Sequence, residues 1–143
     1  MNTMTGLNTR VRRILLALTA ALAAFVGVWA TVFPASFYDS FPGFGLHWIS
    51  EDGAFSAHLI LDVGALNLGF ALAFVAAAVV RGAVAGRVVA LGWTLFGVIH
   101  LGYHLANLDG SVFDRIGNVV TLGLDLALGV VLIVLPTRKA VAK

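Results

Sequence analysis

Two histidines stand four residues apart in a long apolar stretch, in the sequence HLGYH at residues 100–104. Side chains four residues apart share one face of an α-helix, so His100 and His104 could bind one metal ion together. The spacing is that of helical zinc motifs, although the glutamate of His-Glu-x-x-His is missing. Titratable rings inside an apolar segment are costly, and they usually indicate a functional site.

Other polar side chains recur at helical spacing in the neighbouring apolar stretches. His58 and Asp62 are four residues apart, and Asn107 continues the face that carries His100 and His104. Asp125 shares a face with an asparagine and a threonine that precede it by seven and four residues. These positions predict a polar pocket lined by His58, Asp62, His100 and His104, with Asn107 and Asp125 at its edges.

Several chemistries fit such a pocket. Three histidines and a carboxylate suit zinc, copper or non-haem iron, with His58, Asp62, His100 and His104 as the metal ligands. A haem could instead take His58 from one helix and His100 or His104 from another. A proton relay and a quinone or other small-molecule pocket are further alternatives. The remaining alternative is structural, because histidine–carboxylate hydrogen bonds can simply fix how helices pair.

The composition determines which elements must position these side chains. The chain has 143 residues, of which 60% are hydrophobic and only 11% charged, whereas soluble chains are about one quarter charged. Four apolar runs are long enough to cross a bilayer core, which takes about 20 residues. They span residues 14–33, 57–80, 88–106 and 116–135. The sequence therefore predicts one all-α domain, an integral membrane four-helix bundle.

The charges predict how the helices are oriented. Eight of the nine basic residues flank the runs on one side, at residues 10–13, 81–87 and 138–143. The outer loop 34–56 and the connection 107–115 together hold five acids and one arginine. Because cytoplasmic flanks are rich in Lys and Arg, we expect an up-down-up-down bundle with both termini cytoplasmic. This distribution also argues against a nucleic-acid partner for a chain with a net charge of +2.

The outer loop 34–56 carries most of the aromatic side chains, in the sequence FPASFYDSFPGFGLHW and the residues after it. Its prolines and glycines predict short turns. The aromatic residues predict either a belt that anchors two helices at the bilayer surface or a cap over the pocket. The chain contains no cysteine, which excludes disulfides and thiolate metal sites.

The four short helices, this aromatic loop, and the segments HLILDVGALNLGFAL and HLGYHLANLDG resemble small actinobacterial membrane proteins near the DoxX-like superfamily. The resemblance covers most of the chain and implies the four-helix architecture. Some DoxX-like proteins are linked to quinone-dependent redox chemistry or to membrane oxidoreductase assemblies. The resemblance therefore implies a bacterial plasma-membrane protein with an accessory redox role, and it assigns no active-site residue.

Three functions remain open at this point. The first is a membrane protein whose outward-facing pocket binds a metal, haem or quinone. The second is a non-catalytic structural or assembly subunit of a membrane or cell-envelope complex, whose partners are the bilayer and other membrane proteins. The third is a component of a proton-coupled transporter, for which the inner halves of the helices offer few polar residues.

The predicted orientation can be tested by labelling. A cysteine placed in loop 34–56, in a chain that otherwise has none, should react with a membrane-impermeant maleimide added to intact cells. Labelling only after the cells are opened would show that the loop faces the cytoplasm and that the predicted orientation is wrong.

Overall fold

In the computed structural model, the described chain runs from residue 6 to residue 138 and is helical, with no strand in this range. Four helices are long and apolar enough to cross a membrane, which confirms the all-α class and the four apolar helices. They are α1 (Arg10–Val32), α4 (Ala57–Val79), α5 (Val84–Ala106) and α6 (Val112–Val134). Two short helices, α2 (Pro34–Ser40) and α3 (Trp48–Asp52), lie in the outer loop where only turns were expected.

Three of the long helices begin four residues before the apolar runs, at residues 10, 84 and 112 instead of 14, 88 and 116. Capping explains this for α1 and α6. The Thr9 hydroxyl accepts a hydrogen bond from the Arg12 amide, and Ser111 and Asp114 form a reciprocal capping box. A hydropathy pattern ends at the first charged residue, whereas the helix extends to its cap.

Helices α1 and α4 make the most extensive contact of the molecule, and glycines bring their backbones together. A Cβ on Gly27 would lie 2.9 Å from the Leu68 amide nitrogen, and one on Gly64 would lie 3.0 Å from that of Thr31. No larger side chain fits at either position without moving a backbone. Small residues of this kind are what allow helices to pack closely in lipid.

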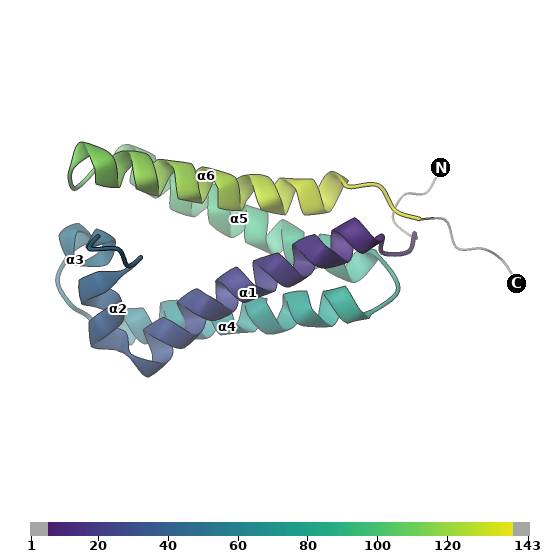
Figure 1. Ribbon diagram of the computed structural model, residues 1–143, viewed down its shortest axis with the longest axis horizontal. Coiled ribbons are helices and arrows are strands. Elements are labelled where there is room, and N and C mark those ends of the chain that lie inside the picture. Colours follow the sequence, from purple (N-terminus) through teal and green to yellow (C-terminus); the bar gives the residue numbers. More distant parts are fainter. Residues whose placement is uncertain (1–5, 139–143) are drawn as a thin grey trace, which may run out of the picture.

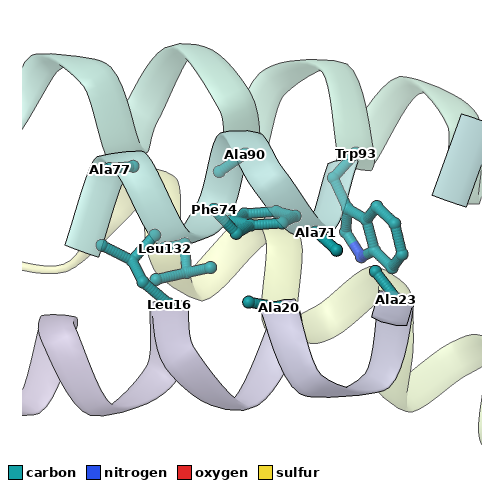
Figure 2. Packing of buried hydrophobic residues seen from close by; sticks show 9 residues of the cluster. All are labelled: Leu16, Ala20, Ala23, Ala71, Phe74, Ala77, Ala90, Trp93 and Leu132. Atoms are coloured by element: carbon teal, nitrogen blue, oxygen red, sulfur yellow. The ribbon is translucent and has the colours of Figure 1, made fainter. Parts of the chain in front are cut away.

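The core lies where all four long helices meet. Leu16 of α1, Phe74 of α4, Trp93 of α5 and Leu132 of α6 are almost completely buried there (Figure 2). Alanines fill the spaces between these larger side chains, as Figure 2 shows for Ala20, Ala23, Ala71, Ala77 and Ala90. This cluster is the principal contact between the α1–α4 pair and the α5–α6 pair.

The two helix pairs meet closely at one end only. Leu7 forms isolated bridges with Gly82 and with Arg138, so the segments before α1, after α4 and after α6 adjoin at what we call the terminal end. The pairs diverge toward the opposite end, which we call the loop end because α2 and α3 lie there (Figure 1). Contacts of α1 with α6 and of α4 with α5 are correspondingly few.

Two buried arginines hold the terminal end. The Arg12 guanidinium donates from Nη1 to the Leu132 carbonyl and from Nη2 to the Leu135 carbonyl. Arg87 Nε donates to the Ile133 carbonyl at 3.1 Å. The last carbonyls of a helix have no partner within it and carry its negative dipole end, so cations from α1 and α5 satisfy the C-terminus of α6.

Replacing Arg12 should therefore weaken the whole bundle. We expect Arg12→Met to lower the free energy of unfolding by about 2–3 kcal/mol, because it removes charged hydrogen bonds to buried carbonyls. Arg10→Met is the matched control, since Arg10 is exposed on the same turn. Thermal unfolding in detergent, followed by circular dichroism, measures both; equal losses in the two variants would contradict the capping role.

Candidate functional site

An aromatic cluster fixes the outer loop against the end of α1. Phe37 of α2 stacks on Phe41 with ring centroids 4.7 Å apart, and both rings contact Trp29 of α1 at 5.9 Å. Phe41 in turn contacts Trp48 of α3 at 6.2 Å. Three aromatic residues of the outer loop, Phe37, Phe41 and Trp48, thus form one connected cluster with Trp29, and this cluster positions α3.

Helix α3 lies against the loop ends of α5 and α6. The Trp48 indole donates from Nε1 to Asp114 Oδ1 at 3.3 Å, and its ring lies so close to α6 that a Cβ on Gly117 would be 3.0 Å from it. The Tyr103 hydroxyl of α5 donates to Asp52 Oδ1 at 3.2 Å. The outer loop therefore covers the end of the α5–α6 pair.

A small polar hollow lies beneath this cap, with a volume of about 20 Å³. That is room for one water-sized occupant. Its lining combines four carboxylates, two amides, an imidazole and an indole. These residues are Glu51, Asp52, Asp109, Asp114, Asn107, Asn118, His104 and Trp48.

The two histidines of HLGYH lie along α5, with His104 at the hollow and His100 one turn farther into the apolar part of the helix. Their rings contact each other with centroids 4.9 Å apart, and His100 stacks on Phe96 at 5.1 Å. Asn118 Nδ2 lies 3.4 Å from His104 Nδ1. If the amide donates this hydrogen bond, the proton of a neutral His104 is on Nε2. His100 is half-buried.

A buried indole stands farther along the same side of α5. Trp93 is 3% exposed and packs edge-on against Phe70 and Phe74 of α4, with centroids 5.0 and 5.5 Å away. Its Nε1 makes no hydrogen bond of normal geometry to any described residue. The half-buried Asp125 of α6 is the carboxylate beside it. The Asp125 carboxylate is therefore the acceptor available to the indole N–H, and this pair of side chains inside the helix packing is a candidate ligand contact.

We call these five side chains the polar track: His104, Asn118, His100, Asp125 and Trp93. The ring of Phe96 lies between His100 and Trp93, at 5.1 and 6.0 Å from them. From His104 to Trp93 the track covers eleven residue steps of α5, about 16 Å at the rise of an α-helix. The track lies entirely on α5 and α6. It can offer hydrogen bonds to a ligand, flat rings for stacking and a carboxylate for proton exchange.

His58 and Asp62 do not join the track. They pair with each other at 3.4 Å on the surface of α4, and their side chains are 89% and 62% exposed. The packed face of α4 instead carries Ile60, Gly64 and Asn67. The spacing correctly places His58 and Asp62 on a shared helix face, but that face points away from the other helices.

The structure therefore does not bring the four predicted metal ligands together. Within residues 6–138, no three His, Asp or Glu side chains are grouped so that they could hold a metal ion. Asn107 lines the hollow, and its Nδ2 also donates to the Tyr103 carbonyl at the end of α5. Of the six predicted pocket residues, His100, His104, Asn107 and Asp125 lie along the hollow and the track.

Sequence reasoning missed the contribution of α3. Glu51 and Asp52 were not among the predicted pocket residues, yet both line the hollow together with Trp48. The signal was the run of aromatic residues immediately before these acids, which marks a segment that packs rather than one that is only solvated. Nothing in the sequence indicates that Asp125 lies beside the Trp93 indole, because that depends on how α5 and α6 pack.

Comparisons with known proteins leave the family open: no family model, no curated protein and no solved structure matches the chain. The function is accordingly inferred from the side chains of the track and the hollow.

The docking of α3 on α6 can be tested at Gly117. In a Trp29→Phe/Trp93→Phe background that leaves Trp48 as the single tryptophan, Gly117→Val should displace the indole, because a Cβ there meets its ring. We expect a red-shifted emission and at least about twofold stronger quenching by acrylamide, since a displaced ring gains exposure. Gly123→Val is the matched control, as a Cβ at Gly123 meets nothing within 4 Å. Unchanged emission in Gly117→Val would contradict the docked position.

Proposed function

We propose that this chain is a multi-pass plasma-membrane protein of bacterial type whose polar track binds the headgroup of a quinone-class, membrane-soluble ligand. Its helices cross the bilayer up-down-up-down, with both termini cytoplasmic and the loop end outside. The protein serves an accessory redox role, in that it holds the headgroup near proton-exchanging side chains.

The observation that carries this proposal is the buried Trp93 indole, which makes no hydrogen bond of normal geometry and has the half-buried Asp125 carboxylate beside it. A quinone carbonyl is an acceptor only, so it can take the indole N–H in place of the carboxylate. His100, half-buried between the rings of Phe96 and His104, offers a second donor and a flat stacking surface. Asp125 lies beside the indole and offers a carboxylate for proton exchange with the headgroup.

Three further points support a ligand of this kind. Pockets for small molecules are largely apolar with a few directed polar groups, which describes the rings of Phe70, Phe74 and Phe96 beside Trp93 and His100. A metal or haem site would need ligands that converge, and His58 is directed away from the helices that carry His100. The resemblance to DoxX-like proteins agrees with a quinone-linked role.

The second candidate is a structural subunit, and the exposure of α6 favours it. Only Gly129 and Leu132 of this 23-residue helix are buried, whereas seven residues of α1 are. A helix that packs so little within its own chain leaves a long apolar face for another membrane protein. In this case Asp125, Trp93, His104 and Asn118 would only stabilise the pairing of α5 with α6.

Quinone binding can be measured by fluorescence. In a Trp29→Phe/Trp48→Phe background in lipid nanodiscs, Trp93 is the single tryptophan, and a short-chain ubiquinone or menaquinone analogue should quench it saturably. His100→Phe keeps the stacking ring but removes its N–H, so the affinity should fall by about tenfold, the effect of one lost hydrogen bond. His58→Phe is the matched control and should bind as the parent does.

The two candidates give different results. Quenching that rises linearly without saturation, or an affinity that His100→Phe leaves unchanged, would overturn the quinone proposal. If Asp125→Asn then lowers the melting temperature without any effect on quenching, the track has the structural role.

A further inference from the structure

The N-terminal segment before α1 joins three parts of the chain at the terminal end. Leu7 exchanges two backbone hydrogen bonds with Arg138, at 2.8 and 3.0 Å. The Asn8 amide donates to the Arg81 carbonyl at 2.8 Å, and the Asn8 side chain donates to the carbonyls of Ala77 and Val80, both at 3.0 Å. Backbone positions at the ends of α4 and α6 are therefore fixed against the start of α1.

This arrangement places three arginines around one open hollow. Arg13 of α1, Arg81 after α4 and Arg138 after α6 line it together with Leu7 and Asn8. Its volume is about 370 Å³, within the range of about 300–1,000 Å³ for small-ligand sites. All three arginines are exposed, and none of their guanidinium groups donates a hydrogen bond to another described residue.

The charge of the hollow is of one sign. The sequence contains no Asp or Glu in segments 1–14, 80–88 and 132–143, so no acidic side chain of these segments opposes the three guanidinium groups. An excess of arginine on one side of a membrane protein explains their number. It does not explain why residues far apart in the sequence converge on one hollow while the exposed Arg10 does not line it.

The hollow lies at the depth of lipid headgroups. Arg13 is the fourth residue of α1, Arg81 follows the end of α4 by two residues, and Arg138 follows the end of α6 by four. All three positions are thus at the boundary of the apolar spans, where phospholipid phosphates lie. Basic pockets at such boundaries bind anionic headgroups, and guanidinium groups match phosphate oxygens with paired N–H donors.

We propose that Arg13, Arg81 and Arg138 form a binding site for the phosphodiester of an anionic phospholipid headgroup. This site is distinct from the polar track and does not need the quinone ligand, although it rests on the proposed insertion of the four helices in the bilayer. The bound lipid would stabilise the terminal end by neutralising three arginines that the fold holds close together. The ligand chemistry is that of a phosphate anion, and its source is the membrane rather than the solution.

Native mass spectrometry of the protein released from detergent measures this binding. With phosphatidylglycerol as the probe, we expect one lipid to bind preferentially over phosphatidylcholine. The triple variant Arg13→Gln/Arg81→Gln/Arg138→Gln should bind it at least about tenfold more weakly, since it removes all three guanidinium groups that line the hollow. Arg10→Gln and Arg115→Gln are matched controls at the terminal and loop ends, and both should bind as the parent does.

Further arms identify the source of the phosphate and exclude unfolding. Inorganic phosphate alone should not raise the melting temperature of the parent, whereas phosphatidylglycerol should. If inorganic phosphate raises the melting temperature as much as phosphatidylglycerol does, the site does not select a lipid. If phosphatidylcholine binds as well as phosphatidylglycerol, the site does not select an anionic headgroup. Circular dichroism should show a folded triple variant; should it unfold, the three single Gln variants replace it, and unchanged lipid affinity in all three would overturn the proposal.

Discussion

The capping of α6 by two buried guanidinium groups is the interaction on which the rest of the structure depends. Arg12 of α1 and Arg87 of α5 both reach the last carbonyls of α6, so a single helix end is shared by both helix pairs. In an apolar surrounding those carbonyls would otherwise lack partners at a cost of several kcal/mol in total. The arginines therefore determine where α6 ends and which helices it meets there. The core of Leu16, Phe74, Trp93 and Leu132 lies directly beside this junction.

The two ends of the bundle differ in chemistry as a consequence. The terminal end gathers guanidinium groups, carbonyls and a backbone ladder, whereas the loop end gathers carboxylates, amides and an imidazole around the small hollow. Between them the long helices present apolar side chains to their surroundings. The polar track extends from the acidic hollow at the loop end to Trp93 in the apolar core. A ligand on the track would thus contact both water at one end and the packed interior at the other.

The sequence was sufficient for the coarse fold, because four apolar runs of about 20 residues leave few alternatives to four long helices. It predicted the face shared by His100 and His104 and the one shared by His58 and Asp62, since both follow from 100° per residue. It could not predict which neighbour each face meets. Gly27 and Gly64 direct α4 onto α1, which turns His58 outward, and this choice depends on packing between residues far apart in the chain. The helix starts were misjudged for a related reason, as caps such as Thr9 lie outside the hydropathy pattern.

The connections between the two helix pairs differ in strength at the two ends of the bundle. At the terminal end, backbone hydrogen bonds and buried arginines connect the helix pairs. At the loop end, α3 links them mainly through the packing of Trp48 and two side-chain hydrogen bonds, Trp48 to Asp114 and Tyr103 to Asp52, each worth about 1 kcal/mol. Separation of the pairs at the loop end therefore costs far less than at the terminal end. The buried arginines form the stronger connection between the helix pairs and the docking of α3 forms the weaker one, so the pairs would separate first at the loop end.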